Sequence, residues 1–561
     1  MKPDNIKQKF TRRAFILMYF KGILSLILGI NIYNIQILSG TKYSVLSDKN
    51  RIRINILEPQ RGLIVDRKGE VIVDNNVLYT ASIATDFYKD IDKILIELKP
   101  ICQTLPVKDN NQYQSQIMLC SNLKWDQVAK IESNIKINQI VKINQSHKRI
   151  YLYNNLLSYI TGYIGIPSKK DVETTATTND FVVGKDGLEM SCEETLKGIY
   201  GIQKVEVNAF GKTVREISTQ SSLPGQIVKT SIDLKLQQKI AEINGDNRGI
   251  HIAADLKTGE ILGMYSSPGY DPNLFTDGIQ SKEWNKIMKD PEKPLLNKSI
   301  LSLYPPGSTF KMITLLAILK SGIKANESVL CLGEINIGRR VFHCWKKYGH
   351  GYVNGYTALE NSCNIYFAIQ GMKAGIDMIA SVAKIFGLGA KTGIELPSES
   401  SGLMPNKQWK KTKKNQVWTF GDTVNISIGQ GDILTTPIQL AIMTARIATG
   451  QFVKPTILCN QKNSFKAIDE INHSHLQIVR DSMYNVMKNH HWENLKIAGK
   501  TGTAQVISKR DATGKFKDHS MFVGFAPYDA PKYSVISIAE NAGWGSDTAL
   551  PITKKIFHEL L

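Results

Sequence analysis

The segment YPPGSTFK at residues 304–311, followed by the apolar run 312–319, decides the fold that this chain is expected to adopt. Ser308 and Lys311 are three residues apart at the start of a predicted helix, so their side chains share one face. A serine hydroxyl is a poor nucleophile until a base removes its proton, and a lysine can be that base where burial lowers its pKa. The helix N-terminus also offers backbone N–H groups to an oxyanion. Taken alone, Ser-x-x-Lys also arises by chance in a lysine-rich chain.

Two further motifs follow in order. The tripeptide Ser-Cys-Asn at 362–364 begins 54 residues after Ser308, and Lys-Thr-Gly-Thr at 500–503 begins 138 residues after Ser362, on a predicted edge strand. Each motif by itself carries little information, and Lys-Thr-Gly also fits a surface turn. A phosphate-binding Walker A loop would need glycine where the chain has Asn494. The three motifs together are the signature of serine enzymes that react with penicillin.

The region around these motifs predicts an antiparallel sheet carrying helices. Alternating apolar residues and turns predict strands at 249–254, 260–264, 520–525 and 533–539, and a closing helix at 551–561. A connecting helix is predicted at 232–238. We therefore expect an α+β catalytic domain at residues 245–561.

A second domain is expected at residues 39–244, as an elongated α/β pedestal. Residues 59–72 predict a strand, a Lys-Gly turn and a second strand, and residues 90–150 a small helical insertion. A helix at 184–189 followed by a hairpin completes this expectation. A chain of 561 residues is long enough for two or more separate cores.

The N-terminus predicts a membrane anchor. Residues 14–38 are mostly apolar and about as long as the roughly 20 residues that cross a bilayer. Five basic residues within the tail 1–13 predict a cytoplasmic N-terminus, with everything after Leu38 outside. A cleavable signal peptide is the alternative, but the apolar stretch is longer than usual and no clear cleavage site follows it.

Composition argues against several other classes. The chain is 42% apolar and 21% charged, as in ordinary globular proteins. Its net charge of +20 would suit an acidic partner, but lysine, isoleucine and asparagine are frequent throughout, which indicates a general compositional bias. The sequence contains no known nucleic-acid-binding motif, so we expect no nucleic acid partner.

Beyond the three motifs, the chain resembles the class B penicillin-binding proteins over nearly its full length. Within them it is most similar to penicillin-binding protein 2, the elongation-type transpeptidase that works beside the glycosyltransferase RodA. The segments that carry the resemblance are 50–52, 61–67, 184–189, 205–208, 270–275, 304–308, 345–351 and 429–431. The division-type paralogue shares the catalytic motifs and remains an alternative, but WKKYGHG at 345–351 and YDPNLF at 270–275 favour elongation.

The resemblance implies a two-step acyl transfer in the bacterial inner membrane, with the catalytic domain in the periplasm. The serine attacks the D-Ala-D-Ala bond of a peptidoglycan stem peptide, and an amine from a neighbouring stem then attacks the acyl-enzyme, which serves cell elongation and rod shape. β-Lactams, which mimic D-Ala-D-Ala, are expected to acylate the same serine. The implied catalytic residues are Ser308, Lys311, Ser362, Asn364 and Lys500, and the implied substrate-binding residues are Thr501, Gly502 and Thr503.

These residues have distinct implied roles. Lys311 would be the base, Ser362 and Asn364 would relay protons and hold the substrate amide, and Lys500 would face the terminal carboxylate. The side chains of Thr501 and Thr503 would bind that carboxylate. The backbone N–H groups of Ser308 and Thr503 would form the oxyanion hole.

A second constellation consists of Cys331, Cys344, His350 and Cys363. Three thiols and an imidazole are the ligand set of a closed tetrahedral zinc site. Their spacing matches no simple zinc finger and leaves open a Cys331–Cys344 disulfide or unrelated buried thiols. The resemblance favours one structural zinc, because some members of this branch bind zinc at these positions. No organic cofactor is expected.

The other thiols have no partner that the sequence reveals; they are Cys102, Cys120, Cys192 and Cys459. The number of cysteines, seven, is odd, and the clustering of three of them within residues 331–363 also argues against a simple disulfide framework.

Two other functions use the same motifs. A β-lactamase or a D,D-carboxypeptidase would hydrolyse the acyl-enzyme, but the roughly 200-residue pedestal favours a wall-synthesis transpeptidase. A scaffold or β-lactam sensor would have a degenerate site, whereas all three motifs are intact.

Overall fold

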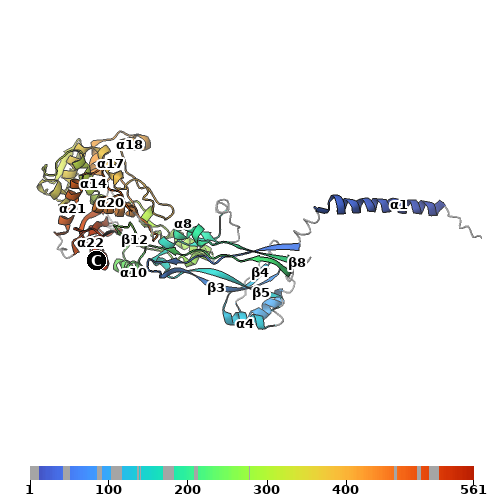
Figure 1. Ribbon diagram of the computed structural model, residues 1–561. Helices are drawn as coiled ribbons and strands as arrows, with labels where there is room; N and C mark the ends of the chain where they lie inside the picture. Colours follow the sequence, from blue (N-terminus) through green and yellow to red (C-terminus); the bar gives the residue numbers. More distant parts are fainter. Residues whose placement is uncertain are drawn as a thin grey trace, which may run out of the picture. The chain divides into compact units, whose positions relative to one another are not determined.

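The computed structural model describes residues 12–41, 51–84, 91–102, 116–134, 138, 140–168, 182–207, 213–276, 278–459, 464–488, 495–504 and 517–561 (Figure 1). Contacts within the chain group it into two compact units. Unit 1 comprises residues 1–60, 77–147 and 198–224, and unit 2 comprises 61–76, 148–197 and 225–561. Unit 2 therefore includes segments that precede residue 245, and the linear boundary at 244/245 stays a prediction.

The central sheet of unit 2 is antiparallel, as the sequence predicts. Its strand order is β12-β11-β19-β18-β17, so β17 lies at one edge. The bounds are β11 (Gly249–Asp255), β12 (Ile261–Ser266), β17 (Ala498–Ala504), β18 (His519–Ala526) and β19 (Tyr533–Ala539). The four strands predicted from apolar alternation and the predicted edge strand are all present, and the closing helix is α22 (Ala549–Leu560).

Helices cover both faces of this sheet, because its strands are apolar on both faces. Ile252 and Ile536 pack in the larger core with α20 (Pro437–Thr449). Their neighbours Ala253 and Val535 point the other way, into a core built with α10 (Leu234–Asn244) and α22. Because side chains alternate along each strand, the sheet has one apolar core on each of its two faces.

Unit 2 contains further helices between residues 273 and 488, most of them in the yellow to red part of the chain (Figure 1). Their bounds are α11 (Asn273–Thr276), α12 (Ser281–Lys289), α13 (Lys298–Leu301), the 3₁₀ turn η4 (Gly307–Phe310), α14 (Lys311–Lys320), α15 (Gly355–Glu360), α16 (Asn364–Ala374), α17 (Ile376–Ile385), α18 (Lys407–Lys414), α19 (Phe420–Ser427) and α21 (His473–Lys488). Every residue of α14 from Lys311 to Leu319 is buried. A helix that is apolar all round belongs in a core, and α14 contacts α16, α17 and α21.

Two small antiparallel sheets of two strands each follow α14. They pair β13 (Val329–Cys331) with β16 (Gly351–Val353), and β14 (Glu334–Ile337) with β15 (Arg340–His343).

The N-terminal segments of unit 2 contain short elements. These are β2 (Ile64–Val65), η3 (Asn154–Leu156), α6 (Ser158–Thr161), β6 (Ile164–Gly165), β7 (Val183–Gly184), α8 (Gly187–Ser191), α9 (Glu193–Leu196) and β10 (Val228–Lys229). A buried ion network joins them, because Glu189 accepts from Arg61 Nε at 2.5 Å and from Arg149 Nε at 2.7 Å. Glu189 is fully buried, so this network fixes segments that are far apart in sequence.

Unit 1 contains a three-stranded antiparallel sheet, β1 (Ile52–Leu57), β8 (Gly201–Val207) and β9 (Thr213–Gln220), in the order β1-β8-β9. The expectation of a helical insertion at 90–150 is wrong in part. That region contains α3 (Ile91–Leu98) and α4 (Trp125–Ser133), but also β4 (Gln116–Leu123) and β5 (Val141–Tyr151). β4 pairs with the end of β3 (Val71–Ala84). Apolar residues such as Leu119 face the helices and made the strands resemble helix in sequence.

Cys102 and Cys120 form a disulfide between the end of α3 and β4. No sequence pattern indicates this pair, because 18 residues separate the two thiols and only the packing of α3 on β4 brings them together. The five other cysteines are free.

The N-terminal helix α1 (Arg12–Tyr33) continues as a short π-helical turn, η1 (Asn34–Leu38). The stretch Ala14–Leu38 is long and apolar enough to cross a membrane, and its side chains are exposed. The expected anchor is therefore a helix, and residues 1–11 of the expected cytoplasmic tail lie outside the described residues.

Candidate active site

Ser308 lies in the tight turn η4, directly before α14, and its side chain is half-buried. Gly307 precedes it with a φ of +54°, a conformation that favours glycine. A Cβ at Gly307 would also lie 2.6 Å from the carbonyl oxygen of Thr503. The backbone that carries Ser308 therefore approaches β17 as closely as a chain can, and only glycine permits this.

Lys311 begins α14 and has no exposed surface. Its Nζ donates to Asn364 Oδ1 at 2.7 Å, to Ser362 O at 2.8 Å and to Ser362 Oγ at 3.1 Å. The hydroxyl of Ser362 in turn donates to Ser308 Oγ at 3.0 Å. A continuous hydrogen-bonded path thus runs from Ser308 through Ser362 to Lys311. Burial lowers the pKa of Lys311 to about 8.

Ser362 lies in the loop between α15 and α16 with a φ of +51°. This left-handed conformation costs a residue with a side chain about 1–2 kcal/mol, and it aims the hydroxyl at Ser308. Cys363 follows as the N-terminal cap of α16, and Asn364 is the first residue of that helix. Three consecutive residues therefore turn the chain sharply beside the nucleophile.

The Lys-Thr-Gly-Thr motif lies on β17, the predicted edge strand. Gly502 allows close contact with the nucleophile turn, because a Cβ there would lie 2.8 Å from Thr309 Cγ2. Lys500 is almost fully buried. Burial, together with the charge of Lys311, lowers the pKa of Lys500 to about 7.

A cavity of about 720 Å³ opens between these elements. The predicted residues that line it are Ser308, Ser362, Asn364, Lys500, Thr501, Gly502 and Thr503. Lys311 lies behind Ser362, and the tertiary structure thus brings all eight predicted residues to one site.

Several further residues line the cavity that the sequence did not assign. They include Trp345, Glu360, Gln430, Asp518 and Trp544. Gln430 could have been found from the sequence, because it belongs to the Gly-Gln-Gly segment that carries part of the family resemblance. Its Nε2 donates to Thr503 O at 3.4 Å. Glu360 and Asp518 could not have been found in this way, because no sequence pattern distinguishes a single acidic residue of a site from an ordinary surface charge.

The four predicted metal ligands also come together. The ligand atoms of Cys331, Cys344, His350 and Cys363 all lie within 4.8 Å of one another. A tetrahedral zinc with sulfur ligands needs donor atoms roughly 3.8 Å apart, so this arrangement fits the ion. The three cysteines are buried.

The turns around this cluster depend on glycine. Gly333 and Gly349 have φ values of +98° and +76°. A Cβ at Gly349 would lie 2.0 Å from the carbonyl oxygen of Cys331. Since the backbone N–H of His350 donates to that carbonyl, the glycine allows the two ligand segments to approach each other.

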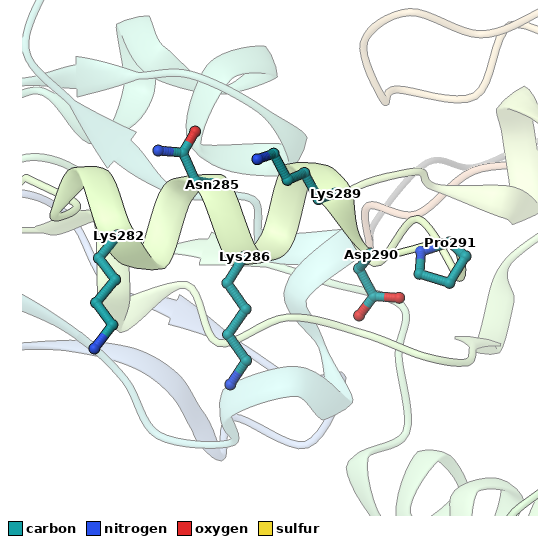
Figure 2. A pocket seen from close by; sticks show the side chains of 6 residues that line it. All are labelled: Lys282, Asn285, Lys286, Lys289, Asp290 and Pro291. Atoms are coloured by element: carbon teal, nitrogen blue, oxygen red, sulfur yellow. The ribbon is translucent and has the colours of Figure 1, made fainter.

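A second surface hollow lies along α12 (Figure 2). Lys282 and Lys286 point to one side of the helix, while Asn285 and Lys289 point to the other. Its lining residues all belong to this helix or to the two positions that follow it. We interpret it as the solvated face of a surface helix.

Comparison with known proteins agrees with this geometry. The family described as penicillin binding protein transpeptidase domain matches residues 249–561, and the penicillin-binding protein dimerisation domain matches residues 56–230. The peptidoglycan D,D-transpeptidase MrdA of Haemophilus influenzae is 33% identical over 98% of this chain and 91% of its own length.

Solved structures are similar as well. Penicillin-binding protein 2 of Helicobacter pylori, in complex with MreC, aligns with a TM-score of 0.81 and 29% identity over 91% of this chain and 98% of that one. A peptidoglycan synthase complex that coordinates polymerization and crosslinking contains a chain with a TM-score of 0.72 and 26% identity, covering 98% of both chains. The chain therefore belongs to the class B penicillin-binding proteins, in the family of penicillin-binding protein 2 (MrdA).

Proposed function

We propose that the protein is an elongation-type peptidoglycan D,D-transpeptidase that works through an acyl-enzyme on Ser308. The Ser308 oxygen attacks the carbonyl carbon of the penultimate D-alanine, the peptide bond breaks, and the terminal D-alanine leaves with a proton. An amine from a second stem peptide then attacks the ester, forms the cross-link and frees Ser308. Water in place of the amine would give D,D-carboxypeptidase hydrolysis.

The observation that carries this proposal is the path from Ser308 through Ser362 to Lys311. Once Lys311 has lost its proton, its lone pair can accept a hydrogen bond from the Ser362 hydroxyl, which in turn can accept one from Ser308. As Ser308 attacks, its proton can then pass to Ser362 while the Ser362 proton passes to Lys311. A lysine with a pKa of about 8 is neutral in an appreciable fraction near neutral pH. Asn364 and the carbonyl of Ser362 hold the lysine in place during the transfer.

The edge strand β17 supplies the residues that would bind the substrate carboxylate. A substrate carboxylate beside Lys500 would favour the protonated, positively charged form of this lysine, which burial disfavours. The hydroxyl groups of Thr501 and Thr503 would donate hydrogen bonds to the same carboxylate. The backbone of the Ser308 turn lies against Thr503, as the close approach of Gly307 requires. Backbone N–H groups of Ser308 and Thr503 would stabilise the tetrahedral oxyanion there.

The proposal is tested by labelling the purified full-length protein with a fluorescent penicillin and mapping the adduct by mass spectrometry. One adduct on the peptide that contains Ser308, absent from a folded Ser308→Ala variant, is expected. A folded protein that forms no adduct, or forms it elsewhere, would refute the assignment. Incubation with stem pentapeptides and an acceptor amine then separates cross-linking from hydrolysis.

We also propose that Cys331, Cys344, His350 and Cys363 bind one structural zinc. Four protein ligands would close the coordination sphere and leave no position for substrate. Cys363 lies between Ser362 and Asn364, so the ion would tie the catalytic loop to the small sheets that follow α14. Its contribution would be to hold that loop.

We further propose that the anchor is a single-pass helix with its N-terminus in the cytoplasm and with the residues after Leu38 in the periplasm. The basic residues that precede the apolar helix support this orientation. The Cys102–Cys120 disulfide also supports it, because disulfides persist in oxidising compartments such as the periplasm.

The protein would act with other components of the elongation machinery, including a RodA-type glycosyltransferase and an MreC-like protein. The support is the likeness to penicillin-binding protein 2 in complex with MreC and to a synthase complex. Unit 1 also exposes apolar side chains on β1 and β9, among them Ile54, Ile56, Val214 and Ile217. Exposed apolar residues of this kind often mark protein contacts.

A further inference from the structure

A buried group of charges lies at the end of β19, outside the three motifs. Glu540 Oε2 accepts from Lys298 Nζ at 2.8 Å and from Arg248 Nη2 at 3.1 Å. The side chains of Lys298 and Glu540 are only 3% and 10% exposed, so this ion pair is shielded from water. Burial would raise the pKa of Glu540, but the hydrogen bond and charge of Lys298 lower it, so the carboxylate stays ionised.

The other oxygen of this carboxylate accepts a hydrogen bond from the segment that carries Ser308. The hydroxyl of Tyr304 donates to Glu540 Oε1 at 2.7 Å. Tyr304 is buried, and its backbone exchanges two hydrogen bonds with Thr435. It is the first residue of the YPPGSTFK segment and precedes Ser308 by four positions.

The residue after Glu540 is hydrogen-bonded to β18, the strand that pairs with β17. The backbone N–H of Asn541 donates to His519 Nδ1 at 3.0 Å. His519 begins β18, where it is paired with Ala504, the residue after Thr503. The His519 ring also meets the Tyr304 ring edge to face, with the ring centres 5.4 Å apart. Glu540 and Asn541 thus connect the nucleophile segment with the end of the sheet that carries Thr503.

We propose that Glu540 is a positioning residue that acts through Tyr304 to fix the Ser308 turn against β17. This inference rests on the proposed function, because the geometry it fixes is that of the Ser308 nucleophile and the oxyanion hole.

The physical reason is the short rigid connection between Tyr304 and Ser308. Two prolines and Gly307 link the residues, and the N–H of Gly307 is itself held by the carbonyl of Gly429. A shift of the tyrosine would therefore be passed on to the serine. A displacement of about 1 Å in a reacting group can cost roughly 100-fold in rate.

The experiment measures acylation of the full-length protein in detergent by a chromogenic β-lactam, with the binding constant Kd and the acylation rate constant k2 determined separately. Tyr304→Phe removes only the hydroxyl, so the ring contact with His519 and the Lys298–Glu540 pair remain. We expect k2 to fall roughly 10-fold or more, with Kd changed less than about twofold, at temperatures where the protein is folded. Glu540→Asp keeps the charge but shortens the reach to Tyr304, and the same decrease is expected.

Two variants separate positioning from stability. Glu540→Gln keeps an oxygen that can accept from Tyr304 but leaves Lys298 without its counter-charge, so Tm is expected to fall while k2 stays within about threefold of wild type. Tyr153→Phe is the matched control, since it removes a Tyr–Glu hydrogen bond of 2.9 Å to Glu70 outside the site. Its k2 is expected to equal that of wild type.

Tyr304→Phe with a k2 within twofold of wild type would overturn the inference. Should Tyr304→Phe fail to fold, a k2 within twofold of wild type for Glu540→Asp would overturn it in the same way. A decrease in k2 for Glu540→Gln as large as for Tyr304→Phe would overturn the assignment to the hydrogen bond. A wild-type protein that is folded but not acylated would instead refute the proposed function, so the two failures are distinguishable.

Discussion

Lys311 is a fully buried lysine whose nitrogen is held by three oxygen atoms, none of which is a carboxylate oxygen. Burial disfavours the ammonium form and outweighs the charges of Cys344 and Cys363, which raise the pKa, so the pKa is lowered to about 8. At the scale of single residues, burial thus makes this lysine easier to deprotonate, as the proposed role of a base requires.

The pH dependence of acylation follows from this pKa. Because the neutral amine accepts the proton, k2 is expected to rise as pH increases through about 8 and to level off above about 9. Lys500, whose pKa is lowered to about 7, would lose its charge at a lower pH than Lys311, which would weaken binding of the carboxylate and raise Kd rather than lower k2. Stopped-flow measurements of k2 across this range check the sign, and a decrease of k2 with rising pH would exclude Lys311 as the base.

The hydroxyl of Ser362 is predicted to be essential for the rate. Ser362→Ala breaks the path between Ser308 and Lys311, and k2 is expected to fall by roughly 10²–10⁴-fold. Lys311 keeps its bonds to Asn364 and to the carbonyl of residue 362, so the fold should persist. Ser482→Ala, which removes a buried hydroxyl bond within α21, is the control and should acylate normally. Equal rates for both variants would remove Ser362 from the mechanism.

At the scale of elements, four segments between α14 and α16 converge on one cluster of donors. β13 ends at Cys331, Cys344 follows β15, His350 precedes β16 and Cys363 caps α16. None of these short strands has a core of its own. A metal ion would supply the cohesion that their side chains lack.

Cys344→Ser is therefore expected to release the bound zinc and to lower Tm by roughly 5 °C or more. Metal content by mass spectrometry and thermal melting of the same samples are the measurements. Cys192→Ser is the matched control, because Cys192 is also a free thiol but lies in unit 2 outside the cluster. A wild-type protein without metal, and a Tm unchanged by Cys344→Ser, would contradict the zinc proposal.

At the scale of the whole molecule, unit 2 is assembled from three separate stretches of the chain. Glu189 joins two of them, because it binds Arg61 from the first stretch and Arg149 from the second. Burial would raise the pKa of Glu189, but the charges of the two arginines lower it, so the buried group is an ionised cluster.

Glu189→Ala would remove the carboxylate partner of the buried Arg149 guanidinium and would leave Arg61 paired with Glu193 alone. A loss of about 3–5 kcal/mol in the free energy of unfolding is expected, since removing one partner of a buried pair is strongly destabilising. Glu194→Ala is the control, because Glu194 is exposed and pairs with Lys197 on the surface. Equal stability of the two variants in denaturant titrations would show that the network does not hold the stretches together.

The sequence by itself determined the α+β class, the five strands of the central antiparallel sheet, the apolar N-terminal helix and the eight residues that the structure brings to one site. These could be predicted because strands and helices leave periodic apolar patterns, and because the three motifs have fixed residue types and a fixed order. The edge position of β17 was also predicted from the place of the Lys-Thr-Gly motif before two further strands.

Only the tertiary structure decided the rest. The Cys102–Cys120 pair, the strands β4 and β5 in the expected helical insertion, and the acidic residues Glu360 and Asp518 at the cavity had no local pattern. The same holds for Glu540, which resembles an ordinary charge after a strand until folding places it against Tyr304 and Lys298. Contacts between residues far apart in the chain depend on packing, which short-range patterns do not record.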